Sequence, residues 1–317
     1  MTVGEAAMGS ASVVLRTMGE KGWAARLVPA ARRFDLWNEL EGRLEDGEID
    51  PELFEVYLRG IETAVRETPE WARSLLIVAV PDPMVRIRFG WHGREIAVTM
   101  PPTYLHWEDR VEGTIDRVLR EGLEGTGHRL GPAVLPKKLL ATRSGLARYG
   151  RNNVSYVEGM GSFHRLAAFY SSVAAHADPW GDPEVLPSCG SCRLCLEACP
   201  AGAIVEDRFL LHAERCLTYW NEKPTDVPFP DELDPQVHEQ LVGCMRCQTA
   251  CPHNHGLLRI EDAEPPLDEE DTERLLLAAS IDALPEATAA KVKRLGLTPY
   301  LDVIPRNLRA VLGSELG

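Results

Sequence analysis

All eight cysteines of this 317-residue chain lie within one stretch of 63 residues, from Cys189 to Cys251. A disulfide framework is typical of small secreted proteins, whereas a chain of this length with 44% hydrophobic residues can build its own core. Zinc is a second possibility, because Cys-x2-Cys pairs form tetrahedral thiolate sites. The spacing of the cysteines therefore has to decide which chemistry they serve.

The first run of cysteines is Cys189-x2-Cys192-x2-Cys195-x3-Cys199, followed by Pro200. Bacterial two-cluster ferredoxins have this spacing: the first three thiolates bind one [4Fe–4S] cluster, and the fourth binds the other cluster. Zinc does not explain the longer x3 step before the Cys-Pro pair. The spacing predicts two [4Fe–4S] clusters.

A second run, Cys244-x2-Cys247-x3-Cys251-Pro252, mirrors the first but contains one cysteine fewer, and the isolated Cys216 supplies the missing ligand. No thiol is then left for another role. One cluster is predicted to be bound by Cys189, Cys192, Cys195 and Cys251, and the other by Cys199, Cys216, Cys244 and Cys247. Two such clusters form a path for electrons, and such a path needs an acceptor at its far end, so the rest of the chain has to be explained.

The rest of the chain mixes helical and strand patterns, which predicts an α+β fold with an α/β-type first domain. We expect helices at 33–44, 52–65, 108–122, 135–147 and 162–175, strands at 74–81 and 152–157, a hairpin at 86–100, and C-terminal helices at 267–279, 287–295 and 307–312, with residues 1–70 largely helical. The predicted domains are 1–180, a ferredoxin-like module at 181–260 and a helical tail at 261–317.

The chain is acidic, with 34 basic and 48 acidic residues and a net charge of −14. This surface argues against general binding to nucleic acids or membrane surfaces. No apolar run approaches the roughly 18 residues that span a bilayer, and the N-terminus does not resemble a secretory signal. We therefore expect a cytoplasmic protein that does not bind membranes.

One segment has the opposite charge. Residues 129–157 contain six basic residues and no acidic one, and they include the glycine-rich stretch 143–153, RSGLARYGRNN. A solvated basic face would explain this. We favour a site for an anionic or amide-rich ligand, because arginine and asparagine supply fixed donors and glycine lets a ligand approach the backbone.

The cysteine segments 189–204 (CGSCRLCLEACPAGAI) and 243–254 (GCMRCQTACPHN), with Cys216 between them, resemble the cluster domain of epoxyqueuosine reductases. The stretch 143–153 is similar to that family's loop of the form RAGLGWIGKN, and the strand at 74–81 and the tail from Asn307 also look related. The resemblance covers roughly residues 70–260 and part of the C-terminus.

The resemblance, which extends more distantly to reductive dehalogenases, implies that cobalamin binds in the first domain beside the nearer cluster. Electrons from a reduced flavodoxin- or ferredoxin-type donor would pass through both clusters to the cobalt. The residues that would contact cobalamin are Arg143, Gly145, Arg148, Gly150, Arg151, Asn152 and Asn153.

The chain also departs from this family. The relatives carry an Asp, proposed as general acid, about a dozen residues before the loop, but no acidic residue occurs here between Glu124 and Glu158. A proton would have to come from elsewhere. We name Tyr149 and Tyr156 as the candidate catalytic residues, with Tyr104 and His106 as further candidates.

The acidic net charge and the lack of the helical repeat that some members append for tRNA predict that tRNA is an unlikely partner and that the substrate is a small molecule. Two functions follow. The first is a cobalamin-dependent iron–sulfur reductase, and the second is a ferredoxin-like electron carrier that donates to a partner enzyme such as a corrinoid protein.

Overall fold

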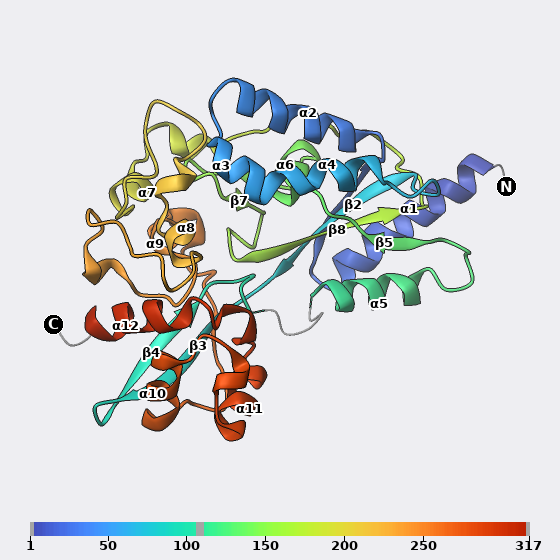
Figure 1. The fold of residues 1–317 in the computed structure, drawn as a ribbon. Helices are drawn as coiled ribbons and strands as arrows, with labels where there is room; N and C mark the ends of the chain where they lie inside the picture. The colour runs from blue at the N-terminus through green and yellow to red at the C-terminus, as the bar shows by residue number, and fades with distance from the viewer. Residues whose placement is uncertain (1–2, 106–110, 315–317) are drawn as a thin grey trace. The chain divides into compact units, whose positions relative to one another are not determined.

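The computed structural model describes residues 3–105 and 111–314 (Figure 1). Their contacts form two compact units. The first unit lies within Met1–Pro81, Asp109–Cys192 and Arg208–Leu211, and the second within Asp82–Glu108, Arg193–Asp207 and His212–Gly317. His106 and the predicted start of the helix at 108–122 lie outside the described residues.

The first unit is built on a four-stranded antiparallel sheet. Its strands, in spatial order, are β1 (Ala24–Pro29), β2 (Ser74–Pro81), β8 (His164–Ser171) and β5 (Leu130–Pro132). The predicted strand at 74–81 is confirmed. After Ser74 it is apolar because both faces are covered: Leu75 and Ile77 enter one core, and Leu76 and Val78 enter the other.

Helices form a layer on each side of this sheet (Figure 1). One layer contains α2 (Arg32–Glu45), α3 (Pro51–Leu53), a π-helical turn (Phe54–Leu58), α4 (Arg59–Arg66) and α6 (Lys137–Arg143). The other contains α1 (Val3–Glu20) and α5 (Glu112–Gly122). The first unit is therefore a three-layer arrangement, and the predicted helices at 33–44 and 52–65 are confirmed.

One secondary-structure expectation is wrong in this unit, and one is incomplete. Residues 162–175 do not form a helix, because His164–Ser171 is strand β8 in the interior of the sheet. The helix-favouring Ala167 and Ala168 alternate between the two cores, and Ala167 pairs with Val78 of β2. The sheet thus overrides local propensity. Residues 1–70 are not wholly helical either, since they contain β1.

The second unit contains a three-stranded sheet in the order β4-β3-β9. The predicted hairpin is confirmed as β3 (Met84–Trp91) and β4 (Arg94–Met100), and β9 (Ile260–Asp262) pairs parallel with β3. The predicted C-terminal helices are present as α10 (Glu269–Leu277), α11 (Glu286–Arg294) and α12 (Ile304–Ser314), which pack with the sheet around one hydrophobic core.

Short helices accompany the cysteines in the second unit. They are α7 (Leu194–Glu197), α8 (Leu217–Asn221) and α9 (Arg246–Thr249). Helices α7 and α9, which lie in the two mirrored cysteine runs, are neighbours. Within the described residues, no helix combines the length and apolar character needed to cross a membrane. The α+β class is confirmed.

Candidate iron–sulfur site

The first cysteine run is attached to the basic stretch through one residue, Arg151. Its backbone N–H points at Cys189 Sγ at 3.4 Å. Its guanidinium donates from Nη2 to the Cys189 carbonyl at 2.6 Å and from Nε to the Cys192 carbonyl at 3.1 Å. All three residues lie in the first unit. The predicted ligand loop and the first two predicted cluster ligands are therefore adjacent.

A small hairpin presents Arg151 to the cysteines. It consists of β6 (Arg148–Tyr149) and β7 (Ser155–Tyr156). Gly150 has to be glycine because a Cβ there would lie 2.5 Å from both Asn152 Oδ1 and the Tyr156 ring. The Asn152 amide donates to the Tyr156 hydroxyl at 3.0 Å. Gly150 and Asn152 thus shape the turn itself, a role that the sequence did not distinguish from ligand contact.

The other two arginines of this stretch are paired with carboxylates of the first unit. Arg143 contacts Glu39 at 2.7 Å and Asp182 at 2.8 Å, and Arg148 contacts Glu184 at 2.7 Å. The Arg148 pair is exposed, so it stabilises little, whereas the Arg143–Glu39 pair is mostly buried. A ligand that used Arg143 or Arg148 would have to share it with these carboxylates.

Asn153 differs from its neighbours. Its backbone has a φ of 58°, in the left-handed region. Its side-chain Nδ2 is buried and has no hydrogen-bond partner among the described residues. Because a buried unpaired N–H group is costly, an acceptor from a ligand would stabilise it. Gly145, with a φ of 69°, has no atom within 4 Å of a Cβ built on it.

The two candidate catalytic tyrosines are packed in the first unit. Tyr149 is 6% exposed, and Phe209 lies edge-on to its ring at a centroid distance of 5.2 Å. Burial raises the pKa of Tyr149. Tyr156 is 5% exposed. The Tyr149 hydroxyl would be protonated at neutral pH. No contact here assigns either tyrosine to catalysis, so that role stays a prediction.

The second predicted quartet lies wholly in the second unit. Burial raises the pKa of Cys216, and burial together with the nearby Cys216 and Cys199 thiols raises the pKa of Cys244 to about 11. The backbone N–H of Ala203 points at Cys199 Sγ at 3.3 Å. A multivalent cationic cluster would stabilise the thiolate form of these buried cysteines.

None of the eight cysteines forms a disulfide in the structure, and all eight are described. Among the described residues, no three His, Cys, Asp or Glu side chains are gathered as the ligands of a single metal ion would be. A [4Fe–4S] cluster instead takes one thiolate on each iron. Assignment of the eight cysteines to two particular quartets stays a prediction.

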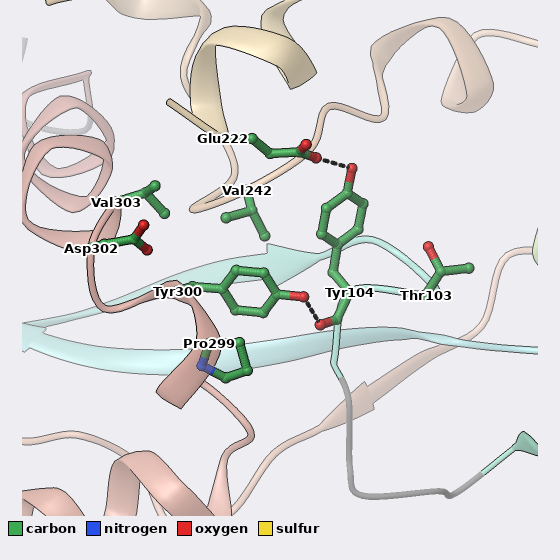
Figure 2. Close-up of a pocket in the computed structure, with 8 residues that line it drawn as sticks. All are labelled: Thr103, Tyr104, Glu222, Val242, Pro299, Tyr300, Asp302 and Val303. Carbon is green, nitrogen blue, oxygen red and sulfur yellow. Dashed lines mark hydrogen bonds between the residues drawn. The ribbon is translucent and has the colours of Figure 1, made fainter. Parts of the chain in front are cut away.

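A pocket of about 320 Å³ lies beside the second quartet in the second unit (Figure 2). The Tyr104 hydroxyl donates to the Glu222 carboxylate at 2.6 Å, and the Tyr300 hydroxyl donates to the Tyr104 carbonyl. The Tyr104 ring packs against Gly243, where a Cβ would meet it at 3.0 Å. Burial raises the pKa of Glu222, and burial and this carboxylate raise that of Tyr104.

Sequence reasoning missed Glu222 and three buried polar residues of this unit, Asn221, Arg306 and Asn307. The only sequence feature that pointed to them was the tail beginning at Asn307, which resembles that of the epoxyqueuosine reductases. Tyr104, a further candidate acid, is committed to Glu222, and His106 lies outside the described residues.

Comparisons with known proteins agree with the cysteine pattern. Residues 188–254 match the family model described as the 4Fe-4S double cluster binding domain (Fer4_16). An epoxyqueuosine reductase from Burkholderia pseudomallei is 30% identical over 259 residues, which are 72% of this chain and 60% of that protein. The chain thus spans less than two thirds of that relative's length.

Solved structures show the same fold. An epoxyqueuosine reductase from Streptococcus thermophilus superposes with a TM-score of 0.66 at 19% identity, covering 96% of this chain and 81% of that one. An epoxyqueuosine reductase solved with a tRNA-Tyr epoxyqueuosine-modified tRNA stem loop has a TM-score of 0.64 at 20% identity, covering 98% and 80% of the two chains.

The prediction that tRNA is an unlikely partner is wrong, because a protein of this fold has been solved with a tRNA stem loop. The error lies in using net charge. A tRNA stem loop would contact only one face of a protein. The charges of acidic residues that lie more than a Debye length, about 8–10 Å, from the stem loop are largely screened. The match and the cysteine pattern establish a double [4Fe–4S] cluster-binding domain at 188–254. The chain therefore carries a double [4Fe–4S] cluster-binding domain and is similar in sequence and fold to epoxyqueuosine reductases.

Proposed function

We propose that this protein is an iron–sulfur reductase that passes electrons through two [4Fe–4S] clusters to a cobalamin and acts on an epoxide-bearing nucleoside in tRNA. The contact between Arg151 and the first cysteine run carries this proposal. It joins the loop expected to meet the cofactor directly to two expected cluster ligands. The substrate class is that of the epoxyqueuosine reductases to which the chain is similar.

The residues of the stretch 143–153 fit cobalamin through uncharged hydrogen-bond donors. The buried, unpaired Asn153 Nδ2 could donate to an amide or phosphate oxygen, and the space beside Gly145 leaves the backbone accessible. Bound there, cobalamin would supply a strongly reducing cobalt centre. Arg151 would hold the first cysteine run against this loop, and the hairpin core of Gly150, Asn152 and Tyr156 would keep Arg151 in place.

Reductive removal of an epoxide oxygen as water consumes two electrons and two protons. The clusters would supply the electrons one at a time. The protons need a donor, and Tyr149 and Tyr156 stay our candidates because both belong to the hairpin that presents Arg151. The raised pKa of Tyr149 keeps its hydroxyl protonated at neutral pH.

The second candidate function, an electron carrier for a partner enzyme, is favoured by the carboxylate pairing of Arg143 and Arg148. In that case the loop would serve only as a support for the first cluster. The two functions differ in whether a corrinoid is retained.

Anaerobic purification with added cobalamin tests both functions. The reductase should contain about eight irons per chain, retain a corrinoid and convert an epoxyqueuosine-modified stem loop but not the unmodified one. Asn153→Ala should lower corrinoid retention without lowering iron. Arg129→Ala is a matched control from the same basic segment, because Arg129 stacks on Trp71. Full iron with no retained corrinoid and no conversion would favour the carrier.

A further inference from the structure

Two buried polar side chains of the C-terminal helix α12 reach the segments that carry the second quartet. Arg306 is 9% exposed and Asn307 is fully buried. Both lie in the second unit, as do Cys199, Cys216, Cys244 and Cys247. Apolar residues would fill this space without the desolvation cost of a guanidinium and an amide. Their hydrogen bonds should therefore explain why polar groups are placed here.

Asn307 joins the segment after Cys216 to the segment before Cys244. Its Nδ2 donates to the Asn221 carbonyl at 2.7 Å and to the Leu241 carbonyl at 2.5 Å. Asn221 ends helix α8, whose N-cap is Cys216. The Asn221 side chain in turn donates to the Gly243 carbonyl at 2.8 Å, one residue before Cys244. The side-chain amides of Asn307 and Asn221 thus each connect the segment after Cys216 to the segment before Cys244.

Arg306 holds the Asn307 amide in the required orientation. Its Nε donates to Asn307 Oδ1 at 3.0 Å, so the Asn307 Nδ2 group must face the two carbonyls. The same guanidinium donates to the carbonyls of Trp220, Pro224 and Val227. Phe229 covers it, with the ring centroid 4.1 Å from the guanidinium carbon. The carbonyls that Arg306 contacts all follow Cys216 within the chain.

We infer that Asn307 and Arg306 are positioning residues for the second [4Fe–4S] cluster. Neither supplies a ligand. They hold the backbone on both sides of the cluster so that Cys216 and Cys244 stay at the separation that one cubane requires. This inference rests on the proposed two-cluster assignment, and it assigns a function to the C-terminal helix.

Asn307→Asp tests the inference, because it preserves shape but removes the donor that both carbonyls need. In anaerobically purified protein, iron should fall from about eight to about four per chain, with the spectroscopic signature of the first cluster retained. Asn221→Asp should have the same effect, and the double variant should lose no more iron than either single variant. Leu308→Ala is the matched control, since Leu308 is fully buried on the same helix and enters the hydrophobic core.

The control should lower the melting temperature while keeping about eight irons. Full iron and an unchanged electron paramagnetic resonance spectrum in folded Asn307→Asp would overturn the inference. Equal iron loss in Leu308→Ala at a matched melting temperature would also overturn it, because general destabilisation would then suffice. An unaltered chain that binds no iron would instead overturn the two-cluster assignment.

Discussion

The two cysteine runs are near copies in sequence, yet the structure supports them in different ways. The first run is held by Arg151, a charged side chain from a hairpin about 40 residues earlier in the chain. The second is held by the neutral amides of Asn221 and Asn307, oriented by a guanidinium from the last helix. The two cysteine runs are therefore not held in place by their own segments alone. Each run is supported by a different segment from elsewhere in the chain.

The sharpest way to separate the two runs is to remove one ligand from each. Cys189→Ala and Cys216→Ala should each leave about four irons per chain, because they belong to different predicted quartets. The remaining clusters should differ between the two variants, and the double variant should lose both. Iron analysis with electron paramagnetic resonance of the reduced protein measures this. Two intact clusters in Cys216→Ala would show that the ligand assignment is wrong.

A smaller effect is expected from the support of the first run. Arg151→Ala removes donors to the Cys189 and Cys192 carbonyls, and hydrogen bonds from charged groups contribute about 1.5–3 kcal/mol each. We expect the first cluster to be lost faster in the presence of a chelator, while the second is lost at the original rate.

Arg148→Ala is the matched control for that experiment, because Arg148 pairs with Glu184 at the surface of the same hairpin. Its iron release should be unchanged. If both arginine variants release iron equally, Arg151 has no special role at the first run and the comparison between the two supports fails.

The smallest effect concerns the Tyr104–Glu222 pair beside the second quartet. Burial raises the pKa of Glu222, and the bond from Tyr104 opposes that rise. Folding therefore favours protonated Glu222, and this contribution to stability is lost as the pH rises through its folded pKa. Tyr104→Phe removes the hydrogen bond that lowers this pKa, so it should raise the pKa of Glu222 further and cost about 1 kcal/mol at neutral pH. Urea unfolding at pH 7 and at pH 4 measures the difference.

The loss of stability in Tyr104→Phe should be smaller at pH 4, where Glu222 carries less negative charge in both the folded and the unfolded chain. Tyr300→Phe serves as a comparison, since Tyr300 donates to the Tyr104 backbone and not to Glu222. A loss that does not change with pH in Tyr104→Phe would show that the carboxylate is not responsible.

Several parts of the fold could be predicted because their signals are local. The strand at 74–81 is apolar after Ser74. The hairpin at 86–100 and the helices at 33–44 and 52–65 follow their expected periodicity. The segment 162–175 could not be predicted correctly. Its alanines favour a helix, and only pairing with β2 makes it a strand.

The candidate site also has a part that the sequence predicted and a part that it did not. The family resemblance pointed to the stretch 143–153, but the sequence could not show that Glu39, Asp182 and Glu184 pair with its arginines. These carboxylates lie 36 to 104 residues from their partners in the chain. The net charge of the chain was also a poor guide to tRNA as a partner, because a tRNA stem loop would contact only one face of the protein.

The sequence by itself determined the metal chemistry of this protein. The cysteines of each run lie a few residues apart, and this spacing is the same whatever fold the rest of the chain adopts. Only the tertiary structure decided what holds those loops in place. Arg151, Asn221 and Asn307 act through backbone carbonyls, and a carbonyl looks the same at every residue, so no sequence pattern marks which ones are bound.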